Sequence, residues 1–275
     1  MTDTDNTDNM DHTGTELVHL ERDDGIARLT LDDPDKRNAL SVEVANGIIA
    51  AVDHLEGTDT RCLVVEGAGE AFSAGGDVEA MIERVAEEQS LDDSVRHVIR
   101  NTGRCVQRVY ESEFPTVAKV DGAAFGAGAN LAIACDLQVF HEDAEIGFGF
   151  RRVGLAVDSG TSFLLPRLVG TNVAKELVYT GELLDAERAV EVGIGNHVYD
   201  ADAFETEAEA LIEEIASGPS VALRTSKRLL DAADASLRQA IAREAGAQAA
   251  VFESDDHAEG VSAFMERRDP EFEGE

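Results

Sequence analysis

The sequence predicts an α/β fold in which a core of strands and helices is followed by a purely helical C-terminal region. Two short apolar strands, at 61–66 and 117–120, each lead through a glycine-rich turn toward a helix. Beyond residue 200 the pattern is helical only, over about 201–216, 219–231, 236–253 and 255–267. These observations divide the 275 residues into a disordered acidic tail at 1–15, a core at 16–200 and a helical region at 201–275.

The first strands form a predicted hairpin. Leu17–Leu20 and Ile26–Leu31 flank an Asp-Asp-Gly tripeptide at 23–25, and Asp-Gly is a strong signal for a tight turn. A polar loop at 32–40 follows, after which Ser41 can cap an amphipathic helix.

Two glycine-rich turns are the part of the chain that most suggests a function. The first covers 67–77, and the second covers 121–130, where a helix is expected to begin near Asn130. Glycine lets the backbone approach a ligand closely, and a helix N-terminus offers unpaired N–H groups. Two such turns could aim one N–H each at a single carbonyl oxygen, as in an oxyanion hole. Taken singly, each turn is better explained as a plain connection between a strand and a helix, because glycine turns at such places are usually no more than that.

Between and after these turns, helices and strands alternate. Asp77 leads into a predicted helix at 78–85, and Ser90 with Asp93 forms a capping box for a long helix that ends before Pro115. Further elements are expected as strands at 137–140 and 197–199 and as helices at 173–179 and 186–192.

The charge of the chain excludes some classes of partner. Lys and Arg number 23 against 56 Asp and Glu, which gives a net charge of −33. An evenly acidic surface repels nucleic acid and anionic membranes, so neither is expected as a partner. Self-repulsion is relieved at molar salt, where the screening length falls to about 3 Å, so we expect a protein from a salt-rich cytoplasm. An ordinary acidic protein is the alternative.

The same sequence gives no sign of membrane, metal or thiol chemistry. It shows neither a signal peptide nor a run of about 18 apolar residues, so a soluble cytoplasmic protein is predicted. Cys62, Cys105 and Cys135 are widely spaced in apolar runs, which favours buried free thiols. The histidines form no ligand pattern, so no metal is expected, and neither Ser73 nor Ser159 has a visible histidine partner.

Several ordered motifs resemble the crotonase superfamily, the enoyl-CoA hydratase/isomerase family, from about Leu17 to Phe272. They are Arg37-Asn38-Ala39-Leu40, Phe72-Ser73-Ala74-Gly75-Gly76-Asp77, Val120-Asp121-Gly122 with Gly126-Ala127-Gly128 and Cys135-Asp136, Gly154-Leu155 with Asp158 and the run 165–170, and Ala263-Phe264 with the run 267–272. The resemblance implies a crotonase-like spiral of ββα repeats whose C-terminal helices assemble trimers or dimers of trimers. It also implies an acyl-CoA thioester substrate and no separate cofactor, since coenzyme A is part of that substrate.

The resemblance also implies a set of site residues. The amides of Gly76 and Ala127 would form the oxyanion hole for the enolate oxygen that appears when a proton leaves C2. Contacts to the substrate or its coenzyme A are assigned to Lys36, Arg37, Ala39, Ala74, Gly75, Asp77, Val78, Gly126, Asn130, Phe150, Phe264 and Arg267. The loop 36–40 and the backbone of 76–78 are expected at the adenine end, and 264–268 at the coenzyme A of a neighbouring subunit. A solvated helix end is the alternative for Arg267.

Two positions argue against the hydratase branch. Hydratases of this family place water with two glutamates, and the matching positions are Asn130 and, at or near it, Phe150. Neither side chain exchanges protons near neutral pH. Asp158 lies in a stretch similar to the isomerase-type and dehalogenase-type branches, although Val157 stands where those isomerases usually have proline.

The resemblance to these branches implies that Asp158 is the acid/base or the nucleophile. An aromatic lining would raise its pKa, and the candidates for it are Phe125, Phe148, Phe150 and Phe163. The leading hypothesis is an enoyl-CoA isomerase, with a ring-opening isomerase of aromatic-derived CoA esters as a close variant. The alternatives are a hydratase that relies on Asp158 alone, a catalytically silent acyl-CoA-binding protein, and hydrolase or dehalogenase-like chemistry. For Asp158 itself, the alternative is a helix cap near Ser159.

Overall fold

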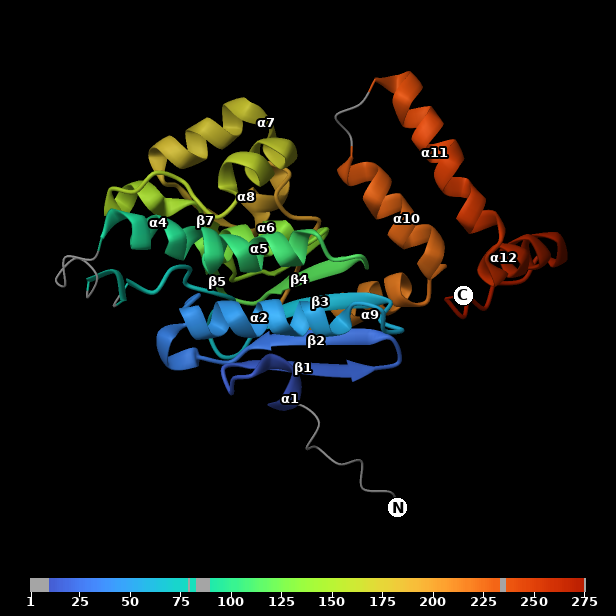
Figure 1. The fold of residues 1–275 in the computed structure, drawn as a ribbon, viewed down its shortest axis with the longest axis horizontal. Coiled ribbons are helices and arrows are strands. Elements are labelled where there is room, and N and C mark those ends of the chain that lie inside the picture. Colours follow the sequence, from blue (N-terminus) through green and yellow to red (C-terminus); the bar gives the residue numbers. More distant parts are fainter. Residues whose placement is uncertain (1–9, 79, 83–89, 233–235, 275) are drawn as a thin grey trace, which may run out of the picture.

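A six-stranded sheet forms the centre of the computed structural model, which describes the chain except for residues 1–9, 79, 83–89, 233–235 and 275 (Figure 1). The strands in spatial order are β1 (Val18–Asp23), β2 (Ile26–Leu31), β3 (Cys62–Gly67), β4 (Thr116–Val120), β6 (Leu137–His141) and β9 (His197–Tyr199). β1 and β2 are antiparallel, and each later neighbour in the sheet is parallel. The predicted hairpin and the strands that follow it are thus confirmed.

A second sheet contains three short strands. They are β5 (Ala123–Phe125), β7 (Glu145–Gly147) and β8 (Leu183–Asp185). The sequence pattern does not reveal them, because three residues are too few for an alternation of apolar and polar side chains. β5 matters for the site because it leads directly into α6 (Ala127–Ala134), which begins at Ala127 rather than near Asn130.

Helices cover both faces of the large sheet. Those of the core are α2 (Val42–Leu55), α4 (Leu91–Arg100), α5 (Thr102–Tyr110), α6, α7 (Thr161–Thr180), α8 (Ala186–Glu191) and α9 (Phe204–Ala216), with short 3₁₀ turns η1 (Pro34–Lys36) and η2 (Gly149–Val153). Alternation along β3 explains how two apolar clusters form. Leu63 and Val65 join the main core with α2, α5 and α6, whereas Cys62 and Val64 pack under α9 on the opposite face.

The long helix predicted from Ser90 is two helices in the structure. Ser90 caps α4 as expected and accepts a hydrogen bond from the Asp93 amide at 3.1 Å. Asn101 then leaves helical geometry at φ −111° and ψ −92°, and its side chain bonds to His97 Nδ1 at 2.8 Å. A local contact between a side chain and the preceding turn therefore ends α4, which helical periodicity alone does not predict.

Two other predicted segments fall partly outside the described residues. The helix expected at 78–85 is described only at Val78 and 80–82, which are helical. Of the tail expected to be disordered at 1–15, the described part includes a short helix, α1 (Met10–Thr13). His12 stacks on His54 of α2 with 3.7 Å between ring centroids, so this part of the tail packs on the core instead of extending into solvent.

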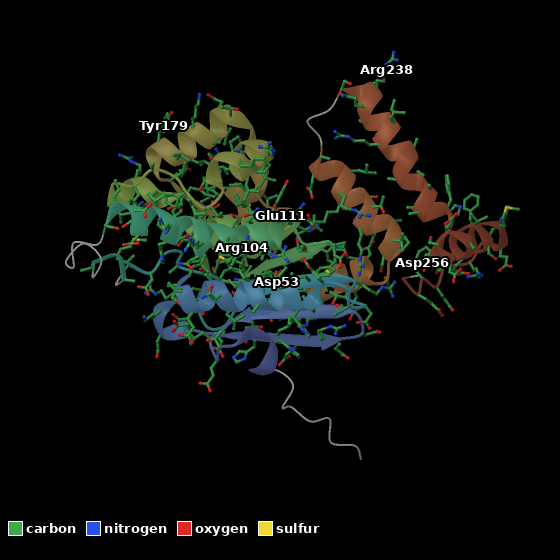
Figure 2. The ribbon with its side chains drawn as sticks, in the orientation of Figure 1. Asp53, Arg104, Glu111, Tyr179, Arg238 and Asp256 are labelled. Carbon is green, nitrogen blue, oxygen red and sulfur yellow. The ribbon has the colours of Figure 1, made fainter. Side chains whose placement is uncertain are left out.

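The last three helices form an arm at one side of the core (Figure 1). They are α10 (Ser220–Asp231), α11 (Leu237–Phe252) and α12 (Asp255–Glu266), close to the predicted ranges. Figure 2 shows Arg238 at the outer end of α11 and Asp256 at the opposite end of the arm. None of the helices in the described part of the chain combines the length and the apolarity needed to cross a membrane.

Candidate active site

The two glycine-rich turns are bound to each other through their backbones. Ser73 pairs with β5: its amide donates to the Ala123 carbonyl at 3.0 Å, and its own carbonyl accepts from the Phe125 amide at 2.9 Å. A Cβ on Gly75 would lie 2.2 Å from the Phe125 carbonyl oxygen and 3.1 Å from the Ala127 nitrogen. Gly75 also has φ +87°, so only glycine fits both the space and the conformation. The first turn therefore lies directly against the start of α6.

The amides of Gly76 and Ala127 belong to these adjoining turns. The Gly75 carbonyl accepts from the Leu40 amide at 2.7 Å, and the Gly126 amide donates to Gly147 at 2.8 Å, so the neighbouring backbone groups are occupied. Ala127 is the first residue of α6 and has no acceptor within the helix. Among the described residues, neither the Gly76 amide nor the Ala127 amide donates to another part of the chain. Both are available to a ligand, and α6 adds the partial positive charge of its N-terminus.

The polar loop before α2 is tied to the first turn. Asn38 is buried, and its Nδ2 donates to the carbonyls of Ala68 at 2.9 Å and Ala71 at 2.7 Å. The Arg37 carbonyl accepts from the Ala74 amide at 2.8 Å. The sequence motif contained Asn38, but the predicted site did not include it, because its role depends on contacts across some thirty residues of chain.

These contacts bring most of the predicted coenzyme A residues into one region. Lys36, Arg37 and Ala39 lie on the loop, next to the segment that contains Ala74, Gly75, Asp77 and Val78, and Gly126 lies in the second turn just before α6. Lys36 Nζ lies 3.6 Å from Asp77 Oδ2, which links the two segments. Phe264 and Arg267 lie apart from this region, on and just after α12 in the arm (Figure 1).

Asp158 lies half-buried just before α7. Its pKa is raised by burial, an effect opposed by a hydrogen bond from the Ser159 hydroxyl. No charged group of the described chain contributes to that shift. The predicted alternative, a helix cap, is not observed: α7 begins after Gly160 without a side-chain cap. A carboxylate with a raised pKa and no fixed ionic partner suits proton transfer.

The backbone around Asp158 is unusually constrained. Ser159 has φ +46°, an uncommon conformation for a residue other than glycine, and its hydroxyl lies 3.0 Å from Thr102 Oγ1. The Asp158 carbonyl accepts from Thr161 N at 3.0 Å and from Asn130 Nδ2 at 2.9 Å. A strained residue beside a perturbed carboxylate is a pattern typical of functional sites.

Asn130 requires a correction. The prediction places it among the residues that contact substrate, but in the structure it is 0% exposed and both ends of its amide are hydrogen-bonded within the protein. Its Oδ1 accepts from the Thr161 hydroxyl at 2.9 Å. The reason is its place on α6, one turn into the helix and directed at the Asp158 segment. Asn130 therefore supports the site instead of lining it.

The predicted aromatic lining is dispersed. Phe148 and Phe150 are buried, whereas Phe163 is exposed on α7, where the Arg167 guanidinium lies 3.4 Å from its ring centre. Phe125 packs against Gly149, at which a Cβ would lie 2.1 Å from the ring. Of the four side chains, Phe163 is thus on the surface and not part of a buried lining.

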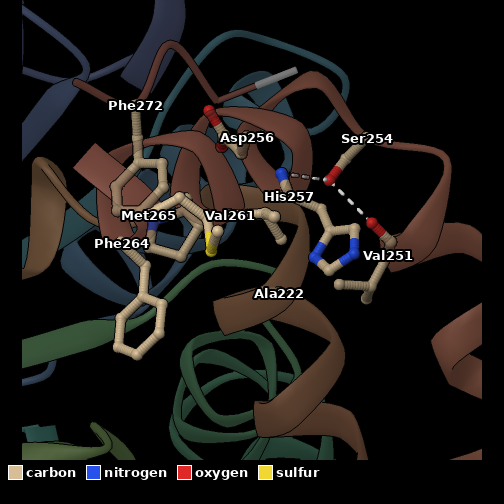
Figure 3. A pocket seen from close by; sticks show the side chains of 11 residues that line it. Ala222, Val251, Ser254, Asp256, His257, Val261, Phe264, Met265 and Phe272 are labelled. Carbon is tan, nitrogen blue, oxygen red and sulfur yellow. Dashed lines mark hydrogen bonds between the residues drawn. The ribbon is translucent and has the colours of Figure 1, made fainter. Parts of the chain in front are cut away.

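An apolar hollow of about 400 Å³ lies in the arm and not at the two turns (Figure 3). Its walls include Ala222 of α10, Val261, Phe264 and Met265 of α12, and Phe272 of the C-terminal segment. Asp256 and His257 also line it, but nowhere in the described part of the chain do three or more His, Cys, Asp or Glu side chains come together in a way that could hold a metal ion.

The cysteines are buried and unpaired, as predicted. Burial raises the pKa of the Cys62 and Cys105 thiols to about 12, and it raises the pKa of Cys135 as well. Thiols that stay protonated at neutral pH are poor nucleophiles, so none of the three is a candidate for covalent catalysis.

Known proteins resemble this chain along nearly its whole length. The family model described as enoyl-CoA hydratase/isomerase matches residues 21–275. A Thermus thermophilus protein provisionally named an enoyl-CoA hydratase is 40% identical over 249 residues, which cover 90% of this chain and 97% of that protein. The 1,2-epoxyphenylacetyl-CoA isomerase of Escherichia coli is 32% identical over 261 residues, which cover 94% and 98% of the two chains.

A solved structure is similar to this chain in fold as well as in sequence. The crystal structure of a Streptomyces coelicolor A3(2) protein, also provisionally named an enoyl-CoA hydratase, superposes with a TM-score of 0.88. It is 33% identical, and the match covers 100% of this chain and 98% of that one. The crotonase-like fold expected from the motifs is thereby confirmed. The names of the relatives include both hydratase and isomerase, so they identify a family and not a single reaction.

Proposed function

The chain belongs to the enoyl-CoA hydratase/isomerase family, and from this premise we propose that it is an enoyl-CoA isomerase that acts on acyl-CoA thioesters. The reaction moves a double bond along the acyl chain by proton transfer. The observation that carries the proposal is that Asp158 is a half-buried carboxylate with a raised pKa, while the two positions expected to hold hydratase glutamates are Asn130 and Phe150.

The proposed mechanism divides the work between the two turns and Asp158. The Gly76 and Ala127 amides bind the thioester carbonyl oxygen. Asp158 takes a proton from C2 of a 3-enoyl-CoA, the C2–H electron pair forms the enolate, and its oxygen becomes an anion held by the two amides. Asp158 then returns the proton at C4, so that the double bond lies between C2 and C3. Each amide would contribute roughly 10²–10³ in rate.

The loop at 36–40 and the backbone around Asp77 and Val78 would hold coenzyme A in this proposal. Lys36 and Arg37 supply positive charge for the anionic groups of coenzyme A on an otherwise acidic protein. No separate cofactor takes part, because an enolate can be formed and reprotonated by one carboxylate and two hydrogen-bond donors.

The test is Asp158→Asn, assayed with a 3-enoyl-CoA by the appearance of the conjugated enoyl absorbance. We expect kcat to fall by about 10²–10⁴-fold while the Kd for a CoA ester stays unchanged. Asp202→Asn, an exposed aspartate on the surface, is the matched control. Full activity of Asp158→Asn would overturn the proposal.

The second candidate is a 2-enoyl-CoA hydratase in which Asp158 activates water alone, a reading favoured by the hydratase names among the relatives. Crotonyl-CoA separates the two, since a hydratase removes its conjugated absorbance and an isomerase of the proposed kind does not. Tight binding of CoA esters without turnover of either substrate would instead identify a silent binding protein.

We also propose that the arm mediates assembly into a homotrimer or a dimer of trimers. Large apolar side chains are exposed along it, namely Leu230, Leu237, Ile241, Phe252, Val261, Phe264 and Met265. In such an assembly Phe264 and Arg267 would approach the coenzyme A of a neighbouring subunit. The net charge of −33 further supports a protein adapted to high salt, for which the free energy of unfolding should rise with KCl in a urea titration.

A further inference from the structure

A buried cluster of hydrogen bonds joins the side chains of Asn130 and Thr161 to the Asp158 carbonyl, and the proton-transfer step alone does not require it. Asn130 and Thr161 lie 31 residues apart in sequence, yet their side chains meet at 2.9 Å, and both contact the Asp158 carbonyl. We propose that Asn130 and Thr161 are positioning residues that fix Asp158 relative to the Ala127 amide. This inference rests on the proposed function of Asp158 as the base.

The hydrogen bonds in this cluster fix the orientation of the Asn130 side-chain amide. A carbonyl oxygen has two lone pairs, and at Asp158 they are satisfied by Thr161 N at 3.0 Å and Asn130 Nδ2 at 2.9 Å. The Thr161 hydroxyl has a single proton and lies 2.9 Å from both the Asp158 carbonyl and Asn130 Oδ1. Donation to Asn130 Oδ1 satisfies that buried acceptor, and it turns the amide so that its NH₂ faces Asp158.

Helix α6 connects this cluster of hydrogen bonds to the proposed oxyanion hole. Ala127 and Asn130 are three residues apart on one face of α6, and the backbone N–H of Asn130 donates to the Gly126 carbonyl at 3.1 Å. The helix therefore joins one proposed oxyanion donor rigidly to the residue that holds the base. One turn of helix and one side-chain hydrogen bond thus connect the Ala127 amide to the backbone of the residue that carries the carboxylate.

The chemistry of position 130 follows from this role. An ionised glutamate has no proton to donate, so at this position it would leave the Asp158 carbonyl without its side-chain donor and would bury an uncompensated charge. A fully buried asparagine thus commits the site to one carboxylate. The hydrogen bond from Asn130 to the Asp158 carbonyl is thus a structural reason for the departure from the two-glutamate pattern, and it is the contact that an introduced glutamate would break.

The experiment compares Asn130→Leu and Thr161→Val with Thr161→Ser, which keeps the hydroxyl. We expect kcat for 3-enoyl-CoA to fall by about 10- to 100-fold in the first two variants, with KM and the Kd for a CoA ester unchanged. Thr161→Ser should retain most of the activity. The double variant should be no slower than the slower single one, because both changes release the same tether. Thr225→Val, at another buried helix threonine, in the arm, is the control for loss of a hydroxyl.

A second readout does not depend on activity. Hydrogen exchange of the amides at 157–161 should accelerate in Asn130→Leu and Thr161→Val relative to the parent, while exchange elsewhere in α6 and α7 stays unchanged. Unchanged exchange at 157–161, or a lower affinity in place of a lower kcat, overturns the positioning role. If Asp158→Asn stays active while exchange accelerates, the tether exists and the isomerase proposal is the part that fails.

Discussion

The core site and the C-terminal arm differ in how closely their residues are packed within one chain. In the core, two turns meet so closely that neither Gly75 nor Gly128 has room for a Cβ, and the polar groups beneath them are paired. In the arm, α11 has no buried residue, and Phe264 of α12 is 82% exposed. The residues of the core site are packed and hydrogen-bonded within one chain, whereas the arm keeps apolar surface that suits a second copy.

The connection between these regions is polar. Lys227 of α10 is buried, and its Nζ donates to Asp136 Oδ2 at 2.8 Å and to the Phe114 carbonyl at 3.1 Å. Arg61, just before β3, donates to the carbonyls of Gly218 at 2.8 Å and Phe272 at 3.1 Å. The arm is therefore attached at a few directional contacts and not through a continuous apolar interface, so these contacts decide whether it stays in place.

The largest effect is expected at this connection. Lys227→Met removes a buried ammonium that donates to Asp136 Oδ2 and to the Phe114 carbonyl, so the free energy of unfolding should fall by about 3 kcal/mol. Urea titration measures it, with the exposed Lys175→Met as the control. Lys227 is buried and also donates to a neutral carbonyl, whereas Asp136 is exposed, so most but not all of the loss should persist in molar KCl, which screens exposed charges far more than buried ones. A loss that disappears in salt would mean that the contact belongs to the surface.

The next effect is expected at the contact between the turns. A Cβ at Gly128 would lie 2.3 Å from the Ser73 carbonyl oxygen, and Gly128 is helical, so Gly128→Ala tests space and not backbone conformation. The turns must separate, which displaces the Ala127 amide from its partner turn. We expect kcat/KM to fall by about 10²–10³-fold, as for the loss of one oxyanion donor. An active variant with normal stability would contradict the proposed geometry.

The sequence predicts local features of this molecule well and remote ones poorly. The strands at β3 and β4, the turns and the arm helices follow from apolar periodicity and glycine placement, which act within a few residues. The role of Asn130 depends on Asp158, 28 residues away, so periodicity assigns it to a helix and says nothing about its partner. The three-residue strands β5, β7 and β8 are likewise defined by their pairing and not by their own pattern.

A further prediction tests the open surface of the arm. Phe264→Asp places a charge on the exposed apolar face of α12 and should shift the protein from its assembled state toward monomer, as truncation of a buried aromatic anchor does in other interfaces. Sedimentation velocity at several protein concentrations measures the shift. Tyr179→Asp, at an exposed aromatic residue of α7 in the core, is the control. A parent protein that is already monomeric would refute the assembly.

A smaller effect concerns pH. The Ser159 hydroxyl lowers the pKa of Asp158 against the rise that burial causes, so Ser159→Gly should raise that pKa further. Glycine also tolerates the φ of +46° at this position. The reaction needs the ionised carboxylate, so the acid limb of the kcat/KM profile should move to higher pH. Ser217→Gly, at the exposed end of α9, should leave the profile in place. A shift to lower pH would show that another group controls the acid limb.

The smallest effect is expected in the arm, when the glycine-to-alanine change made at Gly128 in the core is made at Gly246. Gly246 lies within α11 and is exposed, and a Cβ there would meet nothing within 4 Å. Gly246→Ala should therefore raise the free energy of unfolding by up to about 1 kcal/mol, the difference in helix propensity, and leave activity unchanged. Urea titration and the 3-enoyl-CoA assay measure both. If the variant instead loses assembly, Gly246 lies at the contact between copies, and α11 is packed in the oligomer as closely as the turns are packed in the core.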